Sequence, residues 1–264
     1  MDIGTDRLIG RKDGPIGWMI FNNPQRRNAL SSDMWQAIPG VLAAFEADPE
    51  VRVVVFKGAG DKAFASGADI SQFEDLRANR DANDAYSALS AAATRAMTGL
   101  SKPSIAMIRG FCIGGGLAVA LTCDLRVCSD DSRFAIPAAR LGLGYGFDGV
   151  KALTDVVGPT FAKEILFTAR HLTADDALRI GLVNKVVEGD GLEGAAREYA
   201  RMIAENAPLT VKAAKMAVGE ALRDHEHRRL DAVSRAVDAC FESADYAEGR
   251  KAFLEKRRPV FQGR

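Results

Sequence analysis

Residues 111–125 read FCIGGGLAVALTCDL and place three consecutive glycines, Gly114 to Gly116, between a strand-like and a helix-like apolar segment. A glycine inside an element costs roughly 0.5–1 kcal/mol relative to alanine, so three together indicate a close approach to this backbone. A turn that opens a helix presents free amides, and the helix dipole favours negative charge there. No Lys-Ser or Lys-Thr pair follows, which excludes a P-loop. The run is therefore either a close-packing device or a binding turn.

Strand and helix patterns alternate over the first two-thirds of the chain. β-branched and apolar runs that end in turn residues predict strands, and apolar residues at helical spacing predict helices. The predicted strands are 18–22, 51–58, 104–110, 125–131, 133–139 and 182–187. The predicted helices are 31–45, 78–99, 114–121, 160–169 and 173–180. Strands separated by helices predict an α/β fold with mostly parallel pairing.

The segment EGDGLEG, residues 188–194, has the composition of a linker. Beyond it the pattern is helical nearly to the end of the sequence. We therefore expect an α/β core over residues 1–190 and a helical C-terminal region over residues 191–264.

Charge and cysteine usage exclude several classes of function. Lys plus Arg equals Asp plus Glu, at 35 each, so the chain has no overall basic field for nucleic acid. The four cysteines are irregularly spaced without a CxxC, which predicts reduced core thiols, and the three histidines lack neighbours at metal-ligand spacing. The polar N-terminus and the absence of an apolar run of about 18 residues predict a cytoplasmic protein without membrane contact.

A second turn of small residues follows the strongest predicted strand. The stretch KGAGDKAFASGADIS, residues 57–71, contains Ser66-Gly67-Ala68-Asp69. Two such turns at the ends of two core strands can direct two backbone amides at one oxygen, which is the arrangement of an oxyanion hole. We expect Asp69 to be a local cap or turn residue rather than a base.

Several stretches together resemble the crotonase, or enoyl-CoA hydratase/isomerase, superfamily. They are NNPQRRNALS (22–31), KAFASGADI (62–70), GFCIGGGLA (110–118), CDLRV (123–127), DALRIGLVNKVV (176–187) and FLEKRRP (253–259). The resemblance implies a spiral core of ββα units, a helical C-terminal trimerisation region and a homotrimer or dimer of trimers. It implies a CoA-thioester substrate with no separate cofactor and no metal, and places the oxyanion amides at Ala68 and Gly115.

The same resemblance implies a set of CoA contacts. Exposed Lys and Arg are ordinarily solvated surface residues, and only the resemblance marks Lys62 and Lys256 as phosphate partners. The implied substrate and CoA-binding residues are Arg26, Ala29, Leu30, Lys62, Ala63, Gly114, Phe253 and Lys256.

The sequence departs from the family at the two catalytic glutamates. Ungapped alignment through GFCIGGGLAVA puts the first at Ala118, and alignment through RFAIPAARLGLG puts the second at Ala138. Neither side chain can transfer a proton, and a positioned acid or base contributes about 10²–10⁴-fold to a rate. We therefore expect ordinary hydration to be nearly abolished.

The loop GLGYGFDG, residues 142–149, contains the candidates that replace these acids. Tyr145 and several C-terminal phrases resemble the methylmalonyl-CoA decarboxylase branch, in which the oxyanion hole holds the enolate as CO₂ leaves. That branch has a histidine where this chain has Ala68. Asp148 is a second candidate. Arg140, just before this loop, is a candidate partner for a substrate carboxylate. The alternative interpretations are a pocket-lining aromatic for Tyr145 and a helix N-cap for Asp148.

We predict a lyase or isomerase that acts on an acyl-CoA through an enolate held by Ala68 and Gly115, with Tyr145 and Asp148 as further catalytic candidates. Decarboxylation is the specific alternative. A non-catalytic acyl-CoA-binding protein that kept the fold and lost the acids is the rival from another class.

Overall fold

The computed structural model describes residues 4–69 and 80–264, and its larger sheet has six strands. Their order is β1-β2-β3-β5-β7-β10, in which β1 is antiparallel to β2 and the other pairs are parallel. The strands are β1 (Leu8–Asp13), β2 (Ile16–Phe21), β3 (Val53–Gly58), β5 (Ser104–Ile108), β7 (Leu125–Ser129) and β10 (Lys185–Val187). The predicted α/β class with mostly parallel pairing is confirmed.

A smaller sheet of four short strands has the order β4-β6-β8-β9. Its strands are β4 (Ala63–Ala65), β6 (Phe111–Ile113), β8 (Arg133–Ala135) and β9 (Leu172–Thr173). β6 pairs in parallel with both β4 and β8, so the chain segments after β4 and after β6 leave this sheet at the same edge. Those segments are the two turns of small residues.

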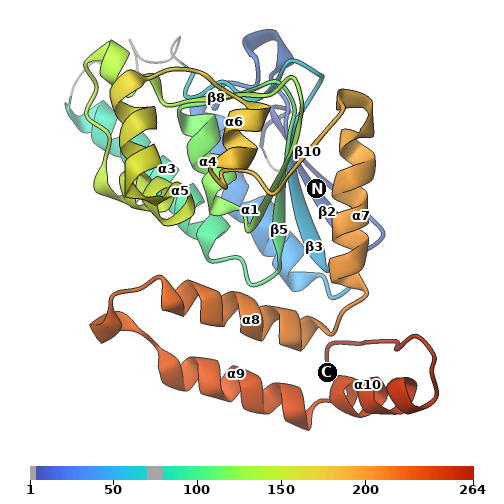
Figure 1. The fold of residues 1–264 in the computed structure, drawn as a ribbon. Helices are drawn as coiled ribbons and strands as arrows, with labels where there is room; N and C mark the ends of the chain where they lie inside the picture. Colours follow the sequence, from blue (N-terminus) through green and yellow to red (C-terminus); the bar gives the residue numbers. More distant parts are fainter. Residues whose placement is uncertain (1–3, 70–79) are drawn as a thin grey trace.

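Helices cover both faces of the larger sheet (Figure 1). Trp18, Val53 and Val55 face α7, whereas their neighbours Met19 and Val54 face the other helices, as the two-residue period of a strand requires. The helices of the core are α1 (Ser32–Ala47), α3 (Arg80–Thr98), α4 (Gly115–Thr122), α5 (Phe147–Thr168), α6 (Ala174–Arg179) and α7 (Leu192–Ala204). α7 packs on the sheet although it lies beyond residue 190. The division into a core of residues 1–190 and a C-terminal region of residues 191–264 stays a prediction.

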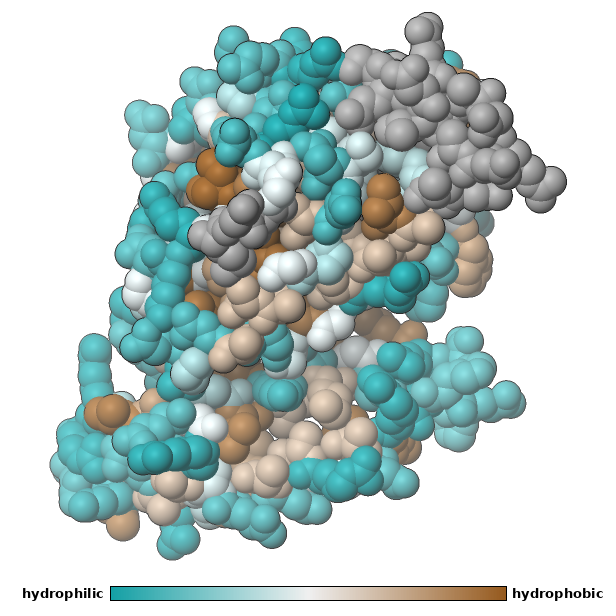
Figure 2. Space-filling view, turned by 180° about the vertical axis from the view of Figure 1, so that it is seen from behind, coloured by the Kyte–Doolittle hydropathy of each residue, from teal (hydrophilic) through white to brown (hydrophobic). Residues whose placement is uncertain are grey.

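The last helices form a layer below the core (Figure 1). They are α8 (Pro208–Ala221), α9 (Leu230–Glu242) and α10 (Ala244–Leu254). A pocket of about 650 Å³ lies among them, with Val237, Phe241, Tyr246 and Phe253 in its lining. Figure 2 shows apolar side chains in this lower part of the molecule, between polar ones. Within the described residues, no helix combines the length and apolar character needed to span a membrane.

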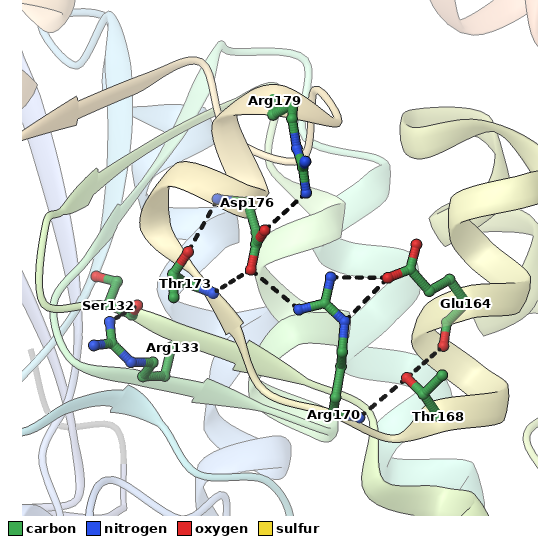
Figure 3. A network of polar contacts seen from close by, with 8 residues as sticks. All are labelled: Ser132, Arg133, Glu164, Thr168, Arg170, Thr173, Asp176 and Arg179. Atoms are coloured by element: carbon green, nitrogen blue, oxygen red, sulfur yellow. Dashed lines mark hydrogen bonds and ion pairs between the residues drawn. The ribbon is translucent and has the colours of Figure 1, made fainter.

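An ion-pair network joins the C-terminal end of α5 to α6 (Figure 3). The Arg170 guanidinium donates to Glu164 at 2.8 Å and to Asp176 at 3.1 Å, and Arg179 also donates to Asp176. Thr173 and Asp176 form a reciprocal capping box at the start of α6, and these hydrogen bonds keep the pKa of Asp176 below its usual value. These contacts anchor the C-terminal end of α5. The N-terminal end of the same helix follows the loop that contains Tyr145.

The main differences from the predicted elements have local causes. The predicted helix at 160–169 is the second half of α5, because Gly158 (φ 75°, ψ 165°) and Pro159 kink the helix just before residue 160. β4, β6 and β9 have only two or three residues, too few to show a period, and were missed. The predicted strands at 18–22, 51–58, 104–110 and 125–131 are confirmed.

Candidate functional site

The first turn of small residues is held by the segment before α1. The Leu30 amide donates to the Gly67 carbonyl at 2.8 Å, and the Asp69 amide donates to the Leu30 carbonyl at 3.0 Å. This parallel bridge skips the amide of Ala68, which lies between the two bonded residues. Ser66 is tied to the same segment by its own amide, which donates to the Arg27 carbonyl at 3.0 Å.

The second turn leads from β6 into α4. Gly114 has φ 52° and ψ −115°, a conformation that favours glycine, and its amide donates to the Ala135 carbonyl at 2.8 Å. The Ala118 amide closes the first helical turn by donating to the Gly114 carbonyl at 3.0 Å. Gly115 is the first residue of α4, where a helix has no internal acceptor for the amide.

The two turns bring Ala68 and Gly115 together. A Cβ added to Gly115 would lie 3.5 Å from the Ala68 nitrogen, and one added to Gly67 would lie 3.8 Å from the Gly115 nitrogen. Within the described parts of the chain, neither of these two amides donates a hydrogen bond. Two adjacent free donors at a helix start are suited to one oxygen that gains negative charge.

The glycines of the run have different roles. A Cβ on Gly116 would lie 2.0 Å from the Ala65 carbonyl oxygen, so this position is occupied by backbone and demands glycine. A Cβ on Gly115 would meet only ordinary contacts, but it would stand beside the Ala68 amide. The run is therefore a close-packing device at Gly116 and keeps a pair of amides open at Gly115.

Asp69, the residue after Ala68, takes part in an ion pair that sequence reasoning missed. Its carboxylate is 7% exposed and lies 3.0 Å from the Arg26 guanidinium, which is 54% exposed. Asp69 is thus paired with a distant cation, whereas the sequence indicated only a local cap or turn. The partners are 43 positions apart in the sequence, which leaves no local signal for this contact.

Asn28 joins the three segments around the first turn, and it too was missed. Its fully buried side chain donates to the carbonyls of Ala63 at 2.7 Å and Ala59 at 3.0 Å, and accepts from the Asn23 amide at 3.0 Å. Its φ of 54° lies in the left-handed region, which Asn tolerates better than most residues. The signal available in the sequence was an Asn at residue 28, since Asn is common where the backbone turns into the left-handed region.

The positions expected for the two acids both end in a methyl group. Ala118 is half-buried on α4, and Ala138 is 7% exposed in the 3₁₀ helix Pro137–Leu141. That helix lies against the second turn, since a Cβ on Gly114 would lie 4.0 Å from Pro137 Cδ. The surroundings of the amide pair are therefore apolar where the family pattern supplies carboxylates.

Tyr145, in the loop before α5, and Asp148, in the first turn of α5, have different surroundings. Tyr145 is half-buried and packs against the core, and burial raises the pKa of its phenol. Asp148 is exposed in the first turn of α5, whose N-cap is Gly146, so its interpretation as the N-cap is wrong. Arg140 is exposed, at the end of the 3₁₀ helix before the loop.

The CoA-binding candidates fall into two groups. Ala29, Leu30 and Ala63 are buried beside the first turn, while Lys62 is exposed next to Ala63. Both backbone groups of Leu30 are already used in the bridge to Gly67 and Asp69. The second group, Phe253 and Lys256, lies at the end of α10 in the lower layer, away from α4 (Figure 1). The structure does not bring these two to the amide pair of their own chain.

Metal and thiol chemistry find little support in the described residues. Within them, no three His, Cys, Asp or Glu side chains cluster as a metal site would require. All four cysteines are free, and burial raises the pKa of the Cys123 and Cys128 thiols to about 12. These thiols stay protonated and serve as core side chains.

Comparison with known proteins gives consistent matches over the whole chain. A family model described as enoyl-CoA hydratase/isomerase matches residues 11–264. The chain is 38% identical to a short-chain-enoyl-CoA hydratase of Clostridium acetobutylicum, over 96% of each chain. It is 36% identical to a crotonyl-CoA hydratase of Syntrophomonas wolfei, over 97% of this chain and 98% of that protein.

Among solved structures, the chain is similar to an enoyl-CoA hydratase/carnithine racemase from Magnetospirillum magneticum. The TM-score is 0.91 with 35% identity, over 99% of this chain and 97% of the other. This similarity confirms the fold that the sequence resemblance implied, with its two sheets and C-terminal helices. None of these comparisons favours the decarboxylase branch in particular.

Proposed function

Because the chain belongs to the enoyl-CoA hydratase/isomerase family, we propose that this enzyme binds an acyl-CoA thioester and holds the derived enolate between the Ala68 and Gly115 amides. The observation that carries the proposal is this adjacent pair of amides, without an acceptor among the described residues. A thioester oxygen gains negative charge as the α-carbon becomes nucleophilic. Preorganised backbone donors stabilise that charge without reorganisation, and loss of one donor typically costs about 2.7–4 kcal/mol.

Because residues 118 and 138 are alanines, the proposed reaction is one that does not depend on a carboxylate at either position. The relatives from Clostridium and Syntrophomonas are named as hydratases, and hydration requires that a base activate water and an acid protonate carbon. In this chain, Tyr145 and Asp148 are the side chains proposed to replace those groups. Asp148 is exposed and Tyr145 half-buried, so Tyr145 is the better placed to meet a substrate shielded from water.

Decarboxylation of a malonyl-type thioester is the second candidate, favoured by the two alanines. In that reaction the bond from the α-carbon to the carboxylate breaks, CO₂ leaves, and the electron pair becomes the enolate. No base is needed, and a later proton reaches the α-carbon from a neutral donor such as Tyr145 or from water. Arg140 is exposed next to the loop and is the proposed partner of the departing carboxylate.

The oligomer is part of this proposal. Phe253 and Lys256 lie in the lower layer, away from the amide pair of the same chain (Figure 1). They contact the CoA only if a neighbouring copy contributes them, which a trimer built through the C-terminal helices would allow. The apolar pocket among α8, α9 and α10 supports such an assembly.

An assay panel separates these candidates. The purified enzyme is offered crotonyl-CoA, methylmalonyl-CoA and ethylmalonyl-CoA while hydration and CO₂ release are followed. CO₂ release with weak crotonyl-CoA hydration supports decarboxylation, and robust hydration that Tyr145→Phe abolishes supports a substitute acid. Tight binding of these esters without turnover across a broader panel supports a binding role. Absence of binding to any CoA ester contradicts the proposal.

A further inference from the structure

The loop from Leu141 to Phe147 reads LGLGYGF, in which large apolar residues alternate with glycine. Three of its large side chains are turned to solvent: Leu141 is 65%, Leu143 47% and Phe147 77% exposed. Tyr145 alone is half-buried and packs against the core. Exposure of several apolar side chains in one short loop is unfavourable, so covering this loop lowers the free energy of the system.

The glycines of this loop are not there because space is short. A Cβ added to Gly142, Gly144 or Gly146 would meet nothing within 4 Å. Only Gly142 has a positive φ, of 63°, so the backbone at Gly144 and Gly146 would accept alanine. Glycines that neither packing nor φ demands make a loop easier to rearrange, because they widen the range of accessible backbone angles.

Both ends of the loop are attached to the neighbourhood of the amide pair. At its start, the Leu143 amide donates to the Ala138 carbonyl at 3.0 Å, and the 3₁₀ helix of Ala138 lies against Gly114. At its end, the loop enters α5, which packs against α4, the helix that begins at Gly115. The loop therefore connects two elements that flank the proposed thioester site.

From this placement we infer that residues 141–147 are an apolar flap that closes over the hydrocarbon chain of the bound acyl thioester, so that the enzyme binds longer alkyl chains more tightly. The inference rests on the proposed function, because the acyl group can reach the flap only from the amide pair. Ala118 on α4 and Ala138 in the 3₁₀ helix carry methyl groups at the positions where the family pattern has charged glutamates. Leu143 and Phe147 supply the apolar surface of the flap, and Gly144 and Gly146 the freedom to close.

The test measures dissociation constants of saturated butyryl-, hexanoyl-, octanoyl- and decanoyl-CoA by calorimetry. For the native chain we expect about two- to fourfold tighter binding per added methylene, as for partial to full burial of a CH₂ group. Leu143→Ser combined with Phe147→Ser is expected to reduce this chain-length dependence severalfold while leaving butyryl-CoA affinity nearly unchanged. The matched control is Leu178→Ser on α6, because the exposed fraction of Leu178, 45%, is similar to the 47% of Leu143.

The outcomes separate this inference from the proposed function. If even butyryl-CoA fails to bind, the proposed function is wrong. If the esters bind but affinity does not rise with chain length, or if the loop variant keeps the full dependence, the flap is refuted. A loop variant that alters the sedimentation coefficient and keeps the dependence would show that a second copy covers the loop. Gly144→Ala with Gly146→Ala tests closure: weaker octanoyl-CoA binding at unchanged Tm supports it, and unchanged binding contradicts it.

Discussion

A Cβ placed on Gly115 would lie 3.5 Å from the amide nitrogen of Ala68, although 46 residues lie between the two along the chain. This proximity is produced by the parallel pairing of β4 with β6, which sends both following turns to one edge of the small sheet. The chemistry proposed for the enzyme depends on this edge of the small sheet.

Gly115→Ala and Gly116→Ala are expected to fail in different ways. The methyl group at 115 meets no clash but stands beside the Ala68 amide, so we expect a folded enzyme with turnover reduced roughly 10²-fold, as for a lost oxyanion donor. The methyl group at 116 would overlap the Ala65 carbonyl, so we expect destabilisation of about 3 kcal/mol or more. Thermal melts and turnover assays check both; full activity in Gly115→Ala would contradict the assignment.

Arg26 and Asp69 are expected to be energetically coupled. Arg26→Met leaves the buried Asp69 carboxylate without this partner, whereas Asp69→Asn keeps its shape and removes its charge. Because the Arg26 side chain is about half exposed, solvent screens the pair, and we expect a coupling of only about 0.5–1 kcal/mol. Urea unfolding of both single variants and the double variant measures it. Additive effects in that cycle would mean that the pair does not hold the turn.

Restoring the acids tests why hydration is expected to be weak. Ala118→Glu combined with Ala138→Glu returns carboxylates to the positions of the family pattern. We expect crotonyl-CoA hydration to rise at least about tenfold, since a positioned acid or base contributes about 10²–10⁴-fold. The matched control, Ala118→Gln with Ala138→Gln, has the same size without the charge and should give no rise. If native hydration already equals that of the double Glu variant, the missing acids are not limiting.

Tyr145 is expected to act as a neutral phenol. Burial raises its pKa above the usual 10.0. The neutral phenol therefore contributes folding stability that is fully present below pH 10 and is lost as the pH rises through the pKa of the folded state. Tyr145→Phe should therefore lessen the loss of stability above pH 10 and should lower turnover by a constant factor at lower pH. Denaturation at several pH values and pH–rate profiles check this. A rate limb near neutral pH that disappears in Tyr145→Phe would contradict it.

The extent to which sequence predicts this protein depends on how local each cause is. The strand around Val53–Gly58 and the helix of residues 31–45 follow from their own periodicity, so both were predicted. In the small sheet, β4, β6 and β9 are too short to carry a pattern of their own and were not predicted. The resemblance pointed to Ala68 and Gly115 as partners, but the ion pair of Arg26 with Asp69 depends on a tertiary contact that no local pattern encodes.

The most direct test of the central claim is the infrared frequency of the thioester carbonyl in a bound acyl-CoA labelled with ¹³C at that carbon. If the Ala68 and Gly115 amides both donate to this oxygen, the stretch in the native enzyme lies below that of the free ester in water, and Gly115→Ala removes much of the shift. A bound carbonyl with the frequency of the free ester, or a shift that Gly115→Ala leaves intact, would contradict the claim.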